Sequence, residues 1–198
     1  MEEMEIVPWA EAFLDEYRLH QSEGEENHLT GDTQIWKRPQ EGRLKINTDA
    51  GIGDEGVGLG VVVRNHMGEF VMAAAKQVRG IQDPTMGEAL AVEFGLQLAR
   101  QHHMVSPIME VDCVNVVAGV RRAAGIQTEL GVICRNISKL LEETGGGTIQ
   151  HVSRKANEAA HIMAHVRTLW DRAEVWFDRP PLILLDQLKI DDVTFPYQ

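Results

Sequence analysis

Three acidic residues stand at points of the chain where a carboxylate could do chemistry. Asp49 ends an alternating strand pattern, Glu88 lies near the start of an apolar helical pattern over residues 85–103, and Asp112 follows a short apolar run over residues 108–111. Carboxylates that meet repel each other unless cations lie between them, and oxygen ligands favour Mg²⁺ or Mn²⁺. The three acids therefore predict a site for two divalent ions, which together can activate water and stabilise a leaving oxygen in phosphodiester hydrolysis.

Each acid also has a structural alternative. Thr85 and Glu88 have the spacing of a capping box, with Thr85 as N-cap and Glu88 three residues later. Asp112 precedes a helical pattern and could be an N-cap. Asp49 has the weakest alternative because a turn, not a helix, follows it. Taken together, Asp49 and Asp112 are expected at the carboxyl ends of neighbouring parallel strands, with Glu88 on the helix that leads to the second strand. Open α/β sheets bind their ligands at these strand ends.

A glycine-rich stretch follows Asp49. Residues 51–56 read GIGDEG and match the dinucleotide fingerprint, but a β-branched strand follows them where that fingerprint requires a helix. The stretch therefore predicts a hairpin turn, whose Gly51 and Gly53 are candidate nucleic-acid contacts. Gly58 and Gly60 continue an alternation of glycines, so that either another element packs closely on that face or a substrate backbone approaches it.

The hydrophobic periodicity predicts an α/β fold. The three strands 44–49, 58–64 and 69–75 are joined by tight turns and should form an antiparallel meander. The later strands are reached through helices and should lie parallel to the first. The expected result is a five-stranded mixed sheet flanked by helices. The remaining predicted elements are helix 85–103, strand 108–111, helices 113–124 and 128–144, strand 148–152, a basic loop at 153–156 and helix 157–170.

Charge divides the chain into three parts. Residues 1–35 hold ten acidic and one basic side chain and combine an amphipathic helical stripe with a polar linker. Residues 36–170, the predicted domain, hold 14 acidic and 15 basic side chains, and residues 171–198 form a predicted tail. Although the net charge is −11, the near-neutral centre leaves a polyanionic partner possible. The N-terminal helix could dock on the predicted domain or bind a protein partner.

The sequence also bears on location. The acidic N-terminus lacks the basic and apolar regions of a signal peptide, and no apolar run is long enough for a transmembrane helix. The two cysteines, Cys113 and Cys134, have no CxxC partner. We therefore expect a reduced, intracellular protein of the nucleus or cytoplasm that does not contact a membrane.

Four motifs in order resemble a known family. INTDAG, GEALAVEFGLQLA, MEVDCVNVV and IQHVSRKANEAAHIMAH are similar to the ribonuclease H-like domain of plant non-LTR retroelement reverse transcriptases and related free-standing plant proteins. The resemblance covers about residues 36–170. It implies a ribonuclease H-like fold and metal-dependent hydrolysis of the RNA strand in an RNA–DNA hybrid. The family's first aspartate, its glutamate and its second aspartate fall on Asp49, Glu88 and Asp112.

The fourth acid of that family is missing. The family pattern N-x-x-A-D-x-L-A begins here at Asn157, and His161 stands where the aspartate is expected. A neutral imidazole can bind Mn²⁺ but suits Mg²⁺ poorly. The resemblance therefore implies a hydrolase that His161 weakens. The alternative is a catalytically impaired domain, derived from a retroelement, that binds nucleic acid or protein. Glu158 could replace the missing acid, or His161 could be a packed helix residue.

The family carries substrate-contacting groups in the loop before its last helix. Arg154 and Lys155 occupy that loop here, and they could contact phosphates or simply lie in a solvated turn. Asn157 is expected to be a helix N-cap and a further nucleic-acid contact. His151, on the last predicted strand, is expected to be an exposed or packed strand residue.

Overall fold

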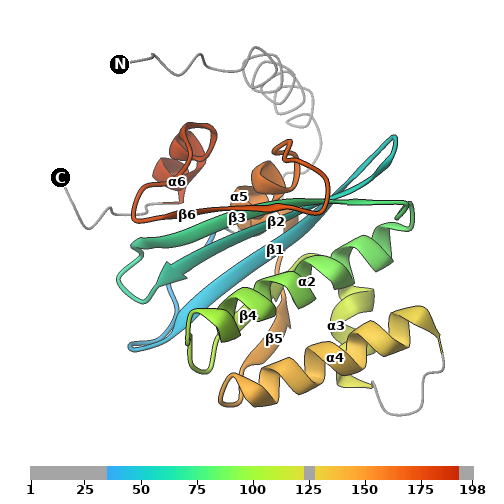
Figure 1. Cartoon of the computed structure of the whole chain (residues 1–198). Coiled ribbons are helices and arrows are strands. Elements are labelled where there is room, and N and C mark those ends of the chain that lie inside the picture. Colours follow the sequence, from blue (N-terminus) through green and yellow to red (C-terminus); the bar gives the residue numbers. More distant parts are fainter. Residues whose placement is uncertain (1–34, 123–127, 192–198) are drawn as a thin grey trace, which may run out of the picture. The chain divides into compact units, whose positions relative to one another are not determined.

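The computed structural model describes residues 35–122 and 128–191. These residues contain one mixed sheet of six strands in the order β5-β4-β1-β2-β3-β6 (Figure 1). β1, β2 and β3 form the predicted antiparallel meander, and β4 and β5 lie parallel to β1. The predicted fold class is therefore confirmed. The strands are β1 (Leu44–Gly53), β2 (Gly56–Asn65), β3 (Phe70–Arg79), β4 (Ile108–Val111), β5 (Thr148–His151) and β6 (Ala173–Phe177).

The sixth strand corrects the predicted strand count. β6 pairs antiparallel with β3, from Met72 opposite Phe177 to Lys76 opposite Ala173, and covers an edge that would otherwise be open. It lies within the predicted tail, and so do the short helices η2 (Leu182–Leu184) and α6 (Leu185–Ile190). The predicted N-terminal helix and linker fall almost entirely outside the described residues.

Helices cover both faces of the sheet (Figure 1). α2 (Pro84–Gln101) packs on the face of β1 that carries Ile46 and Thr48, and α3 (Val114–Arg121) and α4 (Glu129–Glu143) pack beside it. α5 (Arg154–Ala164) packs on the opposite face, with α6 next to it. Among the described residues, no helix combines the length and the apolar character needed to cross a membrane.

α2 begins one residue earlier than predicted. Its N-cap is Asp83, whose carboxylate accepts a hydrogen bond from the Met86 amide at 2.7 Å, and Pro84 occupies the first turn. Proline is favoured there because its missing N–H would have no helical partner. The structural alternative for Glu88, a capping box with Thr85, is therefore not formed. Glu88 lies in the second turn of the helix, where it serves no cap.

β1 is longer than predicted, because it runs through Asp49 and the first glycines to Gly53. The glycines of β2 opposite it allow close packing by a helix. A Cβ on Gly58 would lie 2.0 Å from the Ala164 carbonyl oxygen, and a Cβ on Gly60 would lie 2.2 Å from that of Ala160. The backbone of α5 therefore fills this face of β2. Of the two alternatives for Gly58 and Gly60, the close packing of another element is correct and the approach of a substrate backbone is not.

We expect Gly60→Ala to destabilise the protein by about 2–4 kcal/mol, because a methyl group there collides with backbone that has no room to move. Gly53→Ala is the matched control, since its Cβ would lie 3.7 Å from the nearest atom, an ordinary contact. Urea denaturation of both variants and the wild type measures the effect. Equal stability of the two variants would contradict the close packing of α5 on β2.

Candidate metal centre

The three predicted acids come together. One ligand oxygen from each of Asp49, Glu88 and Asp112 lies within 4.8 Å of the others. The parallel pairing of β1 with β4 runs only as far as Asn47 opposite Glu110. Asp49 and Asp112 follow directly after this pairing, and Glu88 joins them from α2. The three carboxylates thus meet just beyond the end of the parallel pairing, on the side of the sheet where folds of this type bind ligands.

The carboxylates are crowded and poorly solvated. Asp49 is only 3% exposed, and Oε2 of Glu88 is buried with no hydrogen-bond partner. Burial and the negative charges of Asp49 and Asp112 raise the pKa of Glu88 to about 9. Burial and Asp49 also raise the pKa of Asp112. An all-oxygen cluster with an orphaned oxygen fits a hard divalent cation such as Mg²⁺ or Mn²⁺.

We expect metal-free protein to lose stability as the pH rises, and Glu88→Gln to reduce that loss. The pKa of Glu88 rises from its ordinary value of 4.5 to about 9 on folding. The folded state therefore keeps a proton that the unfolded state releases, and stability falls through this interval. The difference between wild type and Glu88→Gln should reach roughly 3 kcal/mol by neutral pH. Urea denaturation in EDTA at pH 5, 7 and 8.5 measures the stability of both proteins. If the stability of wild type and of Glu88→Gln changed in parallel with pH, the raised pKa of Glu88 among crowded carboxylates would be contradicted.

His161 reaches the cluster from α5. Its Nδ1–H donates a hydrogen bond to Oδ2 of Asp49 at 2.8 Å. Burial alone would lower the pKa of His161, but the hydrogen bond and the negative charges of Asp49 and Glu158 outweigh burial and raise it. Glu158 influences this pKa but is not one of the three clustered carboxylates. The imidazole thus stands beside Asp49 and engages an oxygen that a metal ion would also use.

The start of α5 differs from its prediction. Ser153 is the N-cap, and Arg154 and Lys155 are exposed in the first turn of the helix, not in a loop. The positive charge of Arg154 acts to lower the pKa of Asp112, although burial and Asp49 prevail. Asn157 lies inside the helix and is 1% exposed. The prediction that Asn157 is an N-cap is therefore wrong, and its burial leaves no exposed side chain for the predicted contact with nucleic acid.

α3 begins after Cys113 as N-cap, so Asp112 is not a cap residue. His151, at the end of β5, donates from Nε2 to the carbonyl oxygen of Asp112 at 3.2 Å and so helps to fix its backbone. His165 was not predicted as part of this region. It lies one turn after His161, with 4.5 Å between the two ring centres, and this i, i+4 spacing was the available sequence signal.

A groove of about 530 Å³ runs beside the cluster. One wall is the β1–β2 hairpin, including the predicted contacts Gly51 and Gly53, and the other is the segment 164–170 after α5. Gly51 is half-buried, and a Cβ there would lie 3.0 Å from the His165 ring, whereas Gly53 is exposed. The groove therefore begins within two residues of Asp49.

Comparisons with known proteins agree with this geometry. Residues 47–166 match the model of the family described as reverse transcriptase-like. No curated protein matches the chain. In structure, the chain is similar to RNase H1 of Halobacterium salinarum NRC-1, with a TM-score of 0.57, 21% identity, and coverage of 62% of this chain and 95% of the archaeal one.

Two further solved structures are similar. The N-terminal RNase H domain of a Mycobacterium tuberculosis protein gives a TM-score of 0.53 at 20% identity, over 62% of this chain and 90% of that one. LC11-RNase H1, solved in complex with an RNA/DNA hybrid, gives 0.53 at 16% identity, over 61% of this chain and 92% of that one. At these identities the likeness shows a shared fold, namely the ribonuclease H-like fold.

Proposed function

The chain belongs to the reverse transcriptase-like family, and we propose that it is a metal-dependent endonuclease that hydrolyses the RNA strand of RNA–DNA hybrids. The observation that carries this proposal is the convergence of Asp49, Glu88 and Asp112 within 4.8 Å. The ribonuclease H-like fold and a solved relative bound to an RNA/DNA hybrid support it. The four ordered motifs favour an origin among the plant non-LTR retroelement group.

The residues of the chain have distinct parts in this reaction. Asp49, Glu88 and Asp112 would hold two Mg²⁺ or Mn²⁺ ions, which supply an activated water and stabilise the leaving oxygen. Cations bound there would lower the pKa of Glu88, because their positive charge would offset the negative charge of the neighbouring carboxylates, so that Glu88 could bind them as a carboxylate. His161 is placed to orient Asp49 through its hydrogen bond. Attack of water on the phosphorus would break the bond from phosphorus to the ribose 3′ oxygen; the water would lose a proton to solvent, and the leaving oxygen would take one up, giving a 5′ phosphate and a 3′ hydroxyl.

The substrate would be held mainly through its backbone. Arg154 and Lys155 are exposed on the first turn of α5, close to the cluster, where they can contact phosphates. Gly53 is exposed along the groove, where its missing side chain leaves room for the ribose 2′-hydroxyls that distinguish RNA from DNA, whereas Gly51 lies against the His165 ring and would contact the substrate through its backbone only. Because residues 36–170 are near neutral overall, affinity for the hybrid should be modest and sensitive to salt.

The test is a panel of end-labelled duplexes incubated with purified protein. Hybrid, RNA duplex and DNA duplex of the same sequence are compared in Mn²⁺, in Mg²⁺ and in EDTA. We expect cleavage of the RNA strand of the hybrid only, faster in Mn²⁺, with no product in EDTA. Cleavage that persists in EDTA, or that prefers either homoduplex, would contradict the proposal.

A second function is favoured by one observation. His161 donates to Asp49 where the related family carries a fourth acid, so the site has one carboxylate fewer and a competing hydrogen bond. A domain altered in this way could bind hybrid nucleic acid without cutting it. In the same panel, this function predicts a shifted hybrid in gel-mobility assays, with intact RNA in both metals.

A further inference from the structure

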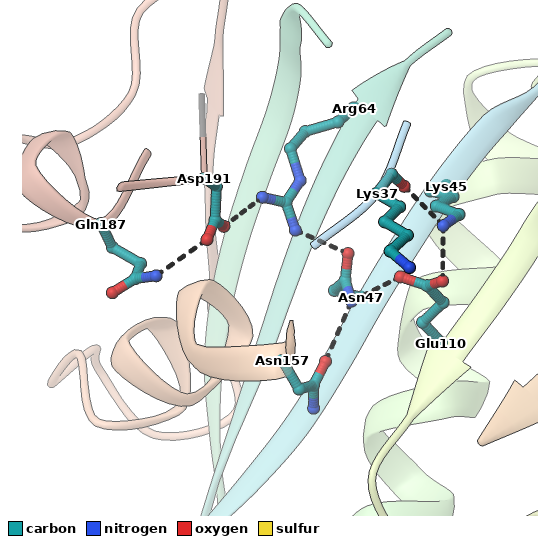
Figure 2. Close-up of polar contacts among 8 residues, drawn as sticks. All are labelled: Lys37, Lys45, Asn47, Arg64, Glu110, Asn157, Gln187 and Asp191. Atoms are coloured by element: carbon teal, nitrogen blue, oxygen red, sulfur yellow. Dashed lines mark hydrogen bonds and ion pairs between the residues drawn. The ribbon is translucent and has the colours of Figure 1, made fainter. Parts of the chain in front are cut away.

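A buried polar network lies on the face of the sheet that α5 covers (Figure 2). It links the C-terminal segment after α6 to strands β1, β2 and β4 and to helix α5. Its four charged side chains alternate in sign, so that each cation contacts an acid, and two amides connect them. The members of this buried network are Lys45, Asn47, Arg64, Glu110, Asn157 and Asp191.

Arg64 is the centre of the buried network. Its side chain is 0% exposed, stacks at 3.9 Å on the ring of Trp36 and ion-pairs with Asp191 at 2.5 Å. Its second terminal nitrogen donates to Oδ1 of Asn47 at 2.8 Å. A guanidinium can only donate hydrogen bonds. The side-chain oxygen of Asn47 must therefore face Arg64, which fixes the orientation of that amide.

The fixed amide of Asn47 sets the orientation of the next one. Its Nδ2 donates to Oε2 of Glu110 and to Oδ1 of Asn157, both at 3.1 Å. The oxygen of Asn157 is thereby turned toward Asn47, and its Nδ2 donates to the carbonyl oxygen of Thr48 at 2.9 Å. The buried ion pair of Arg64 and Asp191 is thus linked through Asn47 and Asn157 (Figure 2) to the hydrogen bond from α5 to the Thr48 carbonyl of β1.

That hydrogen bond lies next to the candidate metal centre. Thr48 directly precedes Asp49 on β1, and Asn157 is one helical turn before His161 on α5. Glu110, held by Asn47 and by Lys45 at 2.7 Å, lies two residues before Asp112 on β4. The buried network therefore ties together the two strands and the helix from which Asp49, Asp112 and His161 project.

We propose that Asp191 is a positioning residue for the metal centre, acting through Arg64, Asn47 and Asn157; this rests on the proposed hydrolase function. Asp191 lies beyond residues 47–166, the part of the chain that matches the family model. It is buried beside α6, where Gln187 also donates to it at 2.9 Å. Without its carboxylate, Arg64 is a buried cation that has lost its ion pair, and its guanidinium is no longer held in the position from which it donates to Asn47.

The first test is Asp191→Asn, which keeps the size of the side chain and removes its charge. We expect kcat for hybrid cleavage to fall about tenfold or more while KM changes by less than about twofold, because the substrate-contacting surface is untouched. Asp186→Asn is the matched control, since this acid on α6 is exposed and pairs with Lys189. An unchanged kcat in Asp191→Asn would overturn the proposal.

A second variant separates positioning from simple loss of stability. Arg64→Met with Asp191→Leu replaces the buried ion pair by apolar side chains of similar length, a change that often leaves stability intact. It also removes the donor that orients Asn47. We expect this double variant to melt within a few degrees of the wild type and yet to cleave as slowly as Asp191→Asn. Recovery of the wild-type kcat would overturn the proposal.

A readout independent of cleavage keeps the two proposals distinguishable. We expect Asp191→Asn to weaken Mn²⁺ binding, measured by calorimetry, by about tenfold. We also expect the NMR signal of the His161 Nδ1–H proton, which is hydrogen-bonded to Asp49 in the wild type, to be lost in the same variant. If wild-type protein cleaves no hybrid, the proposed function fails. Wild-type Mn²⁺ affinity and an intact His161 signal in Asp191→Asn would instead overturn the positioning role.

Discussion

Asp49→Asn should reduce the rate of hybrid cleavage at least about 1,000-fold in both Mg²⁺ and Mn²⁺. Asp49 is buried, lies within 4.8 Å of both other acids and accepts the hydrogen bond of His161. An amide keeps the shape of the carboxylate but loses its charge, and its NH₂ group would face a cation if it turned toward the metal centre. Single-turnover cleavage of a labelled hybrid measures the loss.

The matched control for this variant is Asp186→Asn. This substitution also removes one negative charge, but from an exposed residue of α6 outside the carboxylate cluster, so the cleavage rate should stay unchanged. Asp49→Asn should also fold normally. Because it relieves repulsion with Glu88 and Asp112, its melting temperature without metal should equal or exceed that of the wild type. Cleavage by Asp49→Asn at the wild-type rate would show that the Asp49 carboxylate has no part in the reaction.

His161→Asp should increase the Mg²⁺-supported rate about tenfold and bring it closer to the Mn²⁺-supported rate. The wild-type imidazole donates to Oδ2 of Asp49 and, when protonated, adds a positive charge that opposes a cation there. Aspartate at this position removes both effects and adds an oxygen ligand from α5. The ratio of the rates in the two metals, measured on one hybrid, reports the change.

His161→Asn is the control for this substitution, because it shortens the side chain in the same way without adding charge. It should not reproduce the gain in Mg²⁺. If His161→Asp instead slows cleavage in both metals, His161 takes a direct part in the reaction and is not a damaged fourth ligand.

Much of the fold follows from periodicity. The period-2 strands, the apolar helix over residues 85–103 and the order of the elements are sufficient to predict a meander followed by parallel strands. β6 was not predicted because its five residues are mostly exposed and show little alternation in burial. Its place depends on the open edge of β3, which is a property of the assembled sheet and not of the local sequence.

The convergence of the three acids was predictable because strand order fixes where they must meet. The helix starts were less predictable, since two cap signals competed. Asp83 with Pro84 prevailed over Thr85 at α2, and Ser153 prevailed over Asn157 at α5.

The buried network could not be predicted. Lys45 and Asn47 alternate with Leu44 and Ile46, a pattern that indicates one solvated face of a strand. The close packing of α5 over that face, together with the ion pair from Asp191 after α6, turns the same residues into a buried polar layer.

The most direct test of the metal centre is anomalous diffraction from crystals of the wild-type protein grown with a hybrid and soaked in Mn²⁺. The proposed two-ion site predicts two Mn²⁺ peaks about 4 Å apart. They should be coordinated by Asp49, Glu88 and Asp112 and face an RNA phosphate. Mn²⁺ bound elsewhere while these three carboxylates stay unliganded would contradict the proposed nuclease.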